Sequence, residues 1–470
     1  MKKLLILPIV VVLIQSLQAQ SQLGLQTGNY SGNVALEYNP AFFHAGPLKW
    51  DFSIISGGAF VETDYVYVKD ASVANLLFSD KAVLEIPVDD GQGISSQNIY
   101  YQFVDAVRAM NNSASVFLMG PSFSTRIGRR FSIGVFAKQR VAFSANQIDN
   151  DLSFPSLNNW LLGAEKEFLP VRTTGLMWGE VALNFATGQR IGSKRVSFGG
   201  NVKFLMGQQA LYVFSPSTKA ITVNGRTTIA DDNELYLGFT DFEQGFDLDQ
   251  KGSGLGLDLG LVIVEPSDEN RLYKWRFGVS LSDLGFINFK QKGEAHHFYV
   301  ADNQFIQNAS FDQVSDLASM ASALSQELMN DPNASYLGNR FTIFTPTAIH
   351  ANFDYALKSN FYVNGSLTRR VILNPMQVQK ENQLSVSVRY ETNFFELGIP
   401  AILYDDRNLR FGLWFRFGPL TIGSDHISTL FVPQKQLSGS DVYFALRITD
   451  LNFRANAKKQ SRNTPDQCYW

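Results

Sequence analysis

The sequence predicts an all-β fold, namely a transmembrane antiparallel β-barrel of about 14 strands. Apolar and polar residues alternate over many stretches of about 10 residues, the length that a tilted strand needs to cross a bilayer. The connections between these stretches alternate between short and long. The composition also fits, with 13% aromatic and only 18% charged residues, because every second strand residue of a barrel faces lipid.

The chain begins with the features of a secretory signal peptide. Two lysines precede an apolar stretch from Leu4 to Leu17, and Leu17-Gln18-Ala19 fits a cleavage site. The stretch is shorter than the roughly 20 residues of a membrane-spanning helix, so cleavage is favoured over an N-terminal anchor. We therefore assign residues 1–19 to a signal peptide and expect an exported protein.

Fourteen strands are expected within residues 48–449, the predicted barrel domain. In the sixth strand, Leu257 and Leu259 alternate with Asp258 and Gly260, so Leu259 faces lipid and Gly260 faces the lumen. We expect an arginine at Leu259 to be costly and a small polar residue at Gly260 to be tolerated. The strands are placed near residues 49–66, 115–126, 131–142, 175–187, 195–206, 253–265, 273–284, 346–357, 361–370, 383–392, 394–404, 409–418, 420–428 and 440–449.

Short and long connections between the predicted strands alternate along the chain. Those after even-numbered strands are short, namely residues 127–130, 188–194, 266–272, 358–360, 393 and 419. Those after odd-numbered strands begin long, namely residues 67–114, 143–174, 207–252, 285–345 and 371–382, and then shorten to 405–408 and 429–439. Outer-membrane barrels have tight periplasmic turns and long outer loops. The parity therefore favours a barrel in the outer membrane of a Gram-negative cell over a soluble sandwich, with both chain ends in the periplasm.

The long connection before the eighth strand contains an apolar stripe at helical spacing. Its members are Val314, Leu317, Ala318, Met320, Ala321, Leu324 and Leu328. Such a helix either packs on the outer rim of the barrel or covers the pore as a lid. Residues 450–470, after the last strand, are expected to form a periplasmic tail, and they contain the single cysteine, Cys468. One cysteine cannot form a disulfide within the chain.

The search for reactive groups finds no candidate for catalysis, so we expect no enzyme activity, no cofactor and no bound metal. The sequence has no Gly-x-Ser-x-Gly elbow, zinc motif or calcium loop. His296 and His297 are adjacent, whereas ligands on one face of a strand would lie two residues apart. The formal net charge of -3 argues against nucleic acid as a partner.

The lumen is where charged residues are expected to gather. If the apolar set of each strand faces lipid, the opposite set lines the interior. The lumen-lining candidates are Arg276, Arg389, Arg410, Arg416, Arg447, Asp258 and Asp354. In the strand that begins near residue 273, the same phase directs Tyr273 to lipid and Lys274 inward. Two interpretations remain open, a network of ion pairs between strands or a basic surface that attracts an anionic solute.

A turn-rich segment from Thr27 to Asn33 lies ahead of the first strand, and Asn39-Pro40-Ala41 follows it. In this position the triplet resembles the N-terminal plug of the long-chain fatty-acid transporter type of barrel, which also has fourteen strands. The resemblance implies that residues 20–47 form a plug-like segment, with Asn39, Pro40 and Ala41 as plug candidates. A fourteen-stranded barrel is also too wide for its own side chains to fill, so something must occupy its lumen or leave it open.

A second resemblance involves the stretch from Thr27 to Phe42, Gly418-Pro419-Leu420 and Ser424-Asp425-His426. Together these motifs are similar to an uncharacterised group of outer-membrane barrels in the Bacteroidota. That group is similar in architecture to the shuttle barrel of the type IX secretion system.

Two functions follow from these resemblances. The first is porin-like transport of a hydrophobic or anionic amphipathic solute across the outer membrane. The second is a structural or secretion-system barrel that binds partner proteins through its loops or tail. In both cases the outer-membrane lipid is a partner.

Overall fold

The computed structural model describes most of the chain, and the strands account for most of that part. The signal peptide, the tail after residue 450 and Cys468 lie outside the described residues, so their assignments stay predictions. The described residues are 22–78, 84–85, 99–104, 109–149, 165–216, 218–223, 226–229, 233–241, 248–267, 271–290, 292–300, 304–305 and 314–450.

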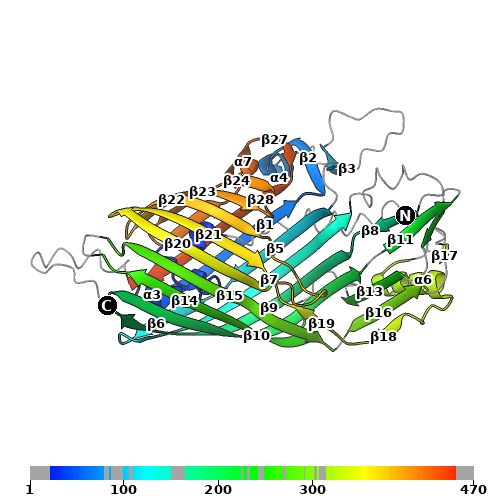
Figure 1. Ribbon diagram of the computed structural model, residues 1–470, viewed down its shortest axis with the longest axis horizontal. Helices are drawn as coiled ribbons and strands as arrows, with labels where there is room; N and C mark the ends of the chain where they lie inside the picture. Colours follow the sequence, from blue (N-terminus) through cyan, green and yellow to red (C-terminus); the bar gives the residue numbers. More distant parts are fainter. Residues whose placement is uncertain are drawn as a thin grey trace, which may run out of the picture.

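One antiparallel sheet closes on itself to form a barrel of fourteen wall strands (Figure 1). The seam joins the first and last strands, with Asp51 opposite Thr449. Three wall positions are interrupted and combine two consecutive strands each. The wall consists of β1 (Trp50–Thr63), β5 (Ala109–Met119) with β6 (Ser122–Ile127), β7 (Phe131–Asp149), β9 (Val171–Ile191), β10 (Lys194–Ser215), β14 (Gly252–Glu265), β15 (Trp275–Phe289), β19 (Phe341–Phe344) with β20 (Ala348–Lys358), β21 (Phe361–Arg370), β22 (Gln383–Glu391), β23 (Phe395–Tyr404), β24 (Asn408–Phe411) with β25 (Leu413–Phe417), β26 (Leu420–Ser424) and β28 (Gly439–Thr449).

This arrangement confirms the predicted fold class and the predicted strand count. The predicted alternation of short and long connections between the wall strands is also observed. Tight turns at Gly128, Gly192 and Gly418 have positive φ angles, which glycine adopts without steric cost. Pro419 sits in the last of these turns, so β26 is only five residues long. In contrast, β9 and β10 are longer than expected, because their alternation continues past the thickness of a bilayer.

The wall continues outward on one side through β13 (Asn233–Thr240), β16 (Gly293–Val300) and β18 (Tyr336–Gly338), which pair successively beyond β10. Helix α6 (Leu317–Met329) packs on this extension, with Ala321 and Leu328 against Phe239 and Phe298. The expected helix therefore lies on the wall extension, which fits the first of its two interpretations. In the described part of the chain, no helix combines the length and apolarity that a membrane crossing requires.

Two smaller sheets stand at the outer end of the barrel, where the long connections lie. The first contains β8 (Glu165–Phe168), β11 (Thr218–Val223), β12 (Arg226–Ile229) and β17 (Gln304–Phe305). The second contains β2 (Val66–Ala71), β3 (Leu84–Glu85), β4 (Ile99–Phe103) and β27 (Gln434–Leu437), and it carries α4 (Val73–Phe78) and α7 (Ile427–Phe431).

The outer surface of the wall is apolar. Leu183 and Phe185 are each 53% exposed, whereas Asn184 between them is buried. The same alternation recurs in most wall strands and gives the surface that faces lipid. At the start of β15 the expected phase is wrong. Tyr273 is buried and Lys274 is exposed. Both residues precede Trp275, the first residue of β15, so the alternation of inward and outward side chains along the strand does not extend to them.

The N-terminal segment, residues 22–47, lies inside the barrel. It consists of α2 (Leu23–Gln26), the 3-10 turn η1 (Gly32–Leu36) and α3 (Phe42–Ala45), coloured dark blue in Figure 1. Almost all of it is buried. Its apolar side chains, including Leu25 and Leu36, pack against inward-facing aromatic side chains such as Phe60 and Trp414.

The lipid-facing surface can be tested at the middle of β14. Replacing Leu259 with arginine, Leu259→Arg, should lower the free energy of unfolding by about 2–4 kcal/mol, because it places a cation near the bilayer midplane. Urea unfolding in lipid vesicles measures the difference. The control is Leu337→Arg on β18, where the side chain is 65% exposed on the wall extension. Equal losses at the two positions would contradict the assigned faces.

Candidate functional site

The N-terminal segment is tied to many strands around the wall. The Asn29 backbone N–H donates to Glu391 of β22 at 2.8 Å, and the Asn33 N–H donates to Asp51 of β1 at 2.7 Å. On the other side of the lumen, Asn201 of β10 donates to the Leu36 carbonyl at 2.9 Å. The segment therefore spans the lumen and is hydrogen-bonded to opposite parts of the wall.

The predicted triplet Asn39-Pro40-Ala41 lies against β14 and β15. The Asn39 amide donates to the Leu261 and Val279 carbonyls at 3.2 and 3.1 Å, so it bridges the two strands. Its own oxygen accepts from the Ala41 N–H at 3.0 Å and fixes the turn. The structure thus gives Asn39 a backbone-binding role that an aspartate could not fill, because that role needs an amide donor.

Three glycines on neighbouring strands make room for this triplet. A Cβ at Gly199 of β10 would lie 2.5 Å from Pro40, and one at Gly260 of β14 would lie 2.2 Å from Asn39 Oδ1. At Gly278 of β15 it would lie 3.3 Å from the Asn39 amide nitrogen, 2.9 Å from the Phe42 ring and 2.3 Å from Asn352 Oδ1 of the wall. The expectation that Gly260 tolerates a polar residue is therefore wrong, because its lumen side is already filled by the segment.

A second segment closes the lumen from the outer side. Residues 371–382, the connection between β21 and β22, fold into the barrel, and we call them the lumen loop. The Val378 N–H donates to the Phe344 carbonyl at 3.1 Å. The Gln379 N–H donates to Ser144 of β7 at 2.9 Å. Since β7 is the third wall strand and the loop joins the ninth and tenth, the loop crosses the lumen.

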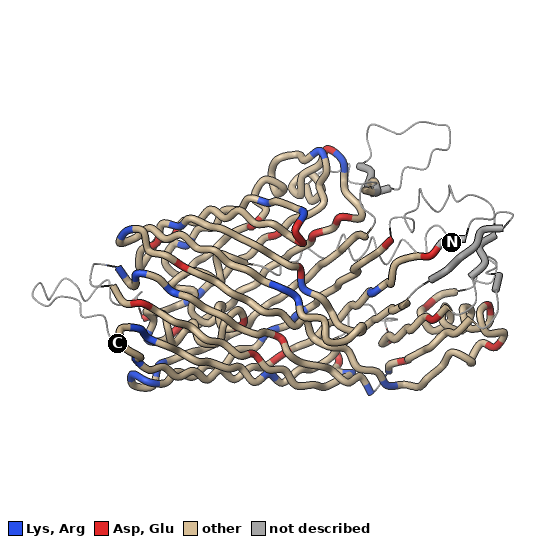
Figure 2. The backbone as a smooth tube through the Cα atoms, in the orientation of Figure 1, with Lys and Arg blue, Asp and Glu red and all other residues tan. Residues whose placement is uncertain are grey.

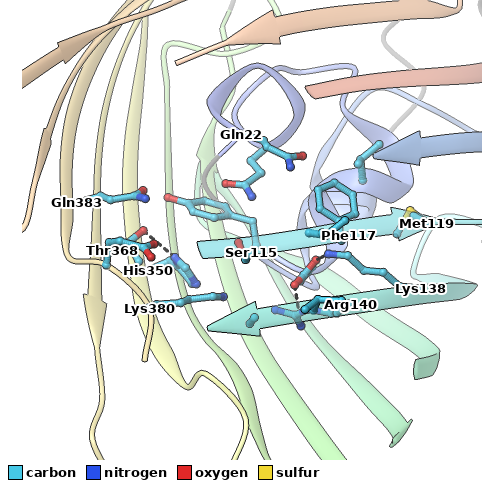
Figure 3. Close-up of a pocket in the computed structure, with 18 residues that line it drawn as sticks. Gln22, Ser115, Phe117, Met119, Lys138, Arg140, His350, Thr368, Lys380 and Gln383 are labelled. Atoms are coloured by element: carbon cyan, nitrogen blue, oxygen red, sulfur yellow. Dashed lines mark hydrogen bonds and ion pairs between the residues drawn. The ribbon is translucent and has the colours of Figure 1, made fainter. Parts of the chain in front are cut away.

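A cavity of about 40 Å³ remains between the N-terminal segment and the lumen loop. Figure 3 shows Gln22 and Lys138 on one side of it, and His350 and Lys380 on the other. This volume holds a few water molecules and no larger solute. Two segments therefore cross the lumen in this conformation, and the cavity between them is too small for a larger solute.

Eight charged side chains join the two segments to the wall, and we call them the central ion cluster. Asp283 of β15 contacts Arg140 at 2.8 Å, Lys203 at 2.7 Å and Lys380 of the lumen loop at 3.0 Å. Glu37 of the N-terminal segment contacts Arg140 at 3.0 Å and also pairs with Lys138. The cations are Lys138, Arg140, Lys203 and Lys380, and the anions are Glu37, Glu180, Asp258 and Asp283.

With four formal cations and four formal anions, the central ion cluster is electrically neutral. Burial alone would raise the pKa of Glu37, but Arg140 and Lys138 hold it well below its ordinary value. Glu37 therefore stays ionised and paired. Removing one member would leave a buried charge without its partner, which costs several kcal/mol.

A second ion cluster holds the start of the N-terminal segment and contains three of the predicted arginines. Arg389 contacts Asp354 at 2.6 Å and Glu391 at 2.8 Å. Arg276 donates to the Thr27 carbonyl at 2.8 Å and lies 3.2 Å from the same Asp354. The third arginine, Arg416, contacts Glu396 at 3.1 Å.

The remaining predicted lumen residues are paired as well. Arg447 donates to the Tyr30 and Ser31 carbonyls, Asp258 lies 2.8 Å from Lys203, and Arg410 lies 2.6 Å from Glu62. Each predicted arginine thus has a carboxylate or carbonyl partner. The interpretation as an ion-pair network fits these contacts, whereas a free basic surface does not.

Sequence reasoning missed several members of these networks. Lys380 lies in a loop and Glu37 in the N-terminal segment, so neither has a strand phase to reveal it. Arg140 lies two residues after Lys138 and shares its phase, which is a signal that could have found it. Among the described residues, no group of His, Cys, Asp and Glu side chains is arranged to hold a metal ion.

On the outer side of the central ion cluster, part of the inner face is apolar. On β9, Glu180 is followed outward by Trp178 and Leu176, and on β10 Lys203 is followed by Leu205, all of them buried. We call the whole set the outer apolar cluster. Its members are Ala142, Leu176, Trp178, Leu205, Ala210, Tyr212, Ile287, Phe289, Ala295, Phe341, Ile343 and Val378.

Comparison with known proteins gives one family and several solved structures. The model of a family of unknown function (DUF5723) matches residues 40–425. None of the curated proteins matches. The matched range runs from Pro40 to Asp425, so it includes part of the N-terminal segment and thirteen of the fourteen wall strands.

The similar solved structures include three barrels. The Ralstonia pickettii toluene transporter TbuX is 9% identical, with 89% of this chain and 94% of that chain covered and a TM-score of 0.30. The Pseudomonas putida toluene transporter TodX is 10% identical, with 92% and 98% covered and a TM-score of 0.32. A Pseudomonas aeruginosa FadL homologue is 8% identical, with 93% and 100% covered and a TM-score of 0.26.

The glycine positions around the triplet provide a test. Gly260→Ala should loosen the N-terminal segment, because the added Cβ overlaps Asn39. Hydrogen exchange of the backbone amides in residues 35–45 should speed up severalfold. Gly365→Ala is the matched control, since no atom lies within 4 Å of its added Cβ. Unchanged exchange in Gly260→Ala would show that the segment is not held at this position.

The lumen loop should respond to pH through Glu381. Burial raises the pKa of Glu381 to about 7, and nearby Asp405 adds to this effect. Because the pKa is raised in the docked state, docking is strongest below the pKa of a free glutamate and weakens as pH rises through 7.

Tryptic cleavage after Lys380, measured relative to cleavage after the exposed Lys435, should therefore increase between pH 6 and pH 8. Glu381→Gln should remove this step, because the amide stays neutral. A step of the same size in Glu381→Gln would assign the pH dependence to another group.

Proposed function

The chain belongs to the family of unknown function DUF5723, and we propose that it carries a hydrophobic or amphipathic solute across the outer membrane of a Gram-negative cell. The path would run through the barrel lumen, which the N-terminal segment and the lumen loop cross in the conformation described above. On this proposal the protein is a transporter, it has no catalytic residues, and the solute and the membrane lipid are its partners.

The outer apolar cluster is the observation that supports this proposal most strongly. Water-filled porins have a polar interior, whereas here Trp178, Tyr212 and Phe289 line the outer half of the lumen. Apolar side chains of this kind favour an apolar solute, at about 25 cal/mol for each Å² removed from water. A solute that enters from outside would meet this surface before it meets the buried charges.

The charged residues are assigned a different role in this proposal. Arg389, Arg410 and Arg416 are each paired with a carboxylate, so an anionic group of a solute would have to displace that partner. We therefore propose a solute whose main contacts are apolar. The arginines would hold the wall and the N-terminal segment together.

Closure would depend on two barriers. Residues 20–47 are proposed as the plug, with Asn39, Pro40 and Ala41 as its contact with β14 and β15. The lumen loop is proposed as the outer barrier. The division into the plug, the barrel at 48–449 and a periplasmic tail at 450–470 belongs to the same proposal.

The alternative is a structural or secretion-system barrel. It is favoured by the folded material at the outer end, where α6 packs on the wall extension and two small sheets add surface for partner proteins. A passage for small solutes does not need this surface. The resemblance to the Bacteroidota group and its shuttle barrel points in the same direction.

Uptake measurements separate the two functions. In proteoliposomes, Ile287→Asn should reduce the entry of a hydrophobic solute severalfold, because it places an amide in the outer apolar cluster. The control is Ile349→Asn, the same change at a lipid-facing side chain that is 47% exposed. It should alter the yield of folded barrel and leave uptake per folded barrel unchanged. Solute entry that equals the protein-free background in the parent barrel would rule out transport.

A further inference from the structure

The second small sheet and its two helices form a separate unit that we call the outer subdomain. It combines the connection after β1 with the connection between β26 and β28. β2 pairs with β27, with Val68 opposite Leu437, and α4 contacts α7. Its small core contains Ala71, Val73 and Leu437. Two connections that are far apart in the sequence are thus held together as one body.

The ends of both helices of the outer subdomain expose large apolar side chains. Leu77 is 52% exposed and Phe78 is 84% exposed at the end of α4, and Phe431 is 69% and Val432 is 56% exposed at the end of α7. The segments around them, residues 72–78 and 427–434, contain no charged residue. The exposed charges of the outer subdomain, Lys69, Asp70 and Lys435, belong to β2 and β27 and not to these segments. Figure 2 shows charged positions on this part of the molecule. A surface in water normally mixes charged residues among its apolar ones.

The outer subdomain also has a distinctive position. Figure 1 shows it at the outer ends of β24 and β28, projecting sideways beyond the outline of the wall and away from the barrel interior. The wall is short on this side, because β26 has only five residues. The subdomain thus lies at the height where the lipid-facing surface of the wall ends.

The exposed helix ends continue that lipid-facing surface along the chain. α7 begins five residues after Ile422 of β26, which is 48% exposed on the lipid side. The chain then returns to β28, where Val442 and Phe444 are 37% and 38% exposed on the same surface. The strands on both sides of α7 therefore present apolar side chains to lipid, and α7 itself contacts β28.

We propose that the outer subdomain inserts the ends of α4 and α7 into the outer leaflet of the membrane, with lipid acyl chains around Leu77, Phe78, Phe431 and Val432. Charge-free apolar side chains of this size gain free energy in acyl chains without needing a hydrogen-bond partner. The wall already provides the membrane beside them, so no further protein is needed to cover them. This inference depends on the barrel fold and not on the proposed transport.

Spin labelling tests the insertion in the full-length barrel. Cys468→Ser removes the only cysteine, and a nitroxide is then attached at Phe431→Cys or, in a second sample, at Phe78→Cys. The protein is reconstituted in phospholipid vesicles, and collisions with oxygen and with a water-soluble nickel complex are compared. Val386→Cys, 55% exposed on β22, is the lipid control, and Asn333→Cys, at an exposed polar side chain in the turn after α6, is the water control.

The ratio of oxygen to nickel collisions at residues 78 and 431 should match the lipid control and exceed the water control severalfold. A ratio equal to that at Asn333→Cys would place the helix ends in water and overturn the proposal. Low collision rates with both reagents would show that protein covers them, and would overturn it too. In that case spectral broadening between labels identifies a second copy of the chain as the cover.

Discussion

The interaction on which the rest of the structure depends is the contact of Asp283 with three cations. Arg140 and Lys203 come from the wall, and Lys380 comes from the lumen loop. A buried carboxylate is stable only while its partners are in place. Through Arg140 the same cluster includes Glu37 of the N-terminal segment. The lumen loop, the N-terminal segment and five consecutive wall strands (β7, β9, β10, β14 and β15) are therefore held by one set of charges. None of these parts can leave alone without exposing a buried charge.

The apolar and polar zones of the lumen are consequences of this arrangement. The ion clusters need polar partners and close packing, so the N-terminal segment with its many backbone groups lies beside them. Farther out, Trp178 lies at the boundary, with its indole N–H donating to Glu180 at 3.1 Å and the Arg140 guanidinium above its ring. Beyond it the outer apolar cluster lines one part of the lumen, and Val378 of the lumen loop packs into this cluster. One short stretch of the wall thus separates two environments that would select different ligands.

The sequence was informative where structure is local and periodic. Alternation and the parity of the connections predicted all fourteen strands, and strand phase predicted that residues such as Arg389 face inward. The sequence did not reveal the partners of those residues, because the partners are distant along the chain. Arg389 contacts Asp354, 35 residues away, and Arg447 contacts Tyr30, 417 residues away. The lumen loop was also missed, since nothing in a connection of twelve residues distinguishes one that folds inward. The environment of Gly260 was mispredicted for the same reason. Its position in the strand predicts that it faces the lumen, but does not reveal that the N-terminal segment contacts it there.

The seam between β1 and β28 is reinforced from inside the barrel. The N-terminal segment precedes β1 directly, yet it is held by the last strands as well, where Tyr443 accepts from the Gly24 N–H and Arg447 donates to Tyr30. These contacts with β28 exist only when the last strand is in the wall, so docking of the segment and closure of the seam stabilise each other. The two edges of the sheet are thus joined twice, once by the strand pairing at the seam and once through the interior of the barrel.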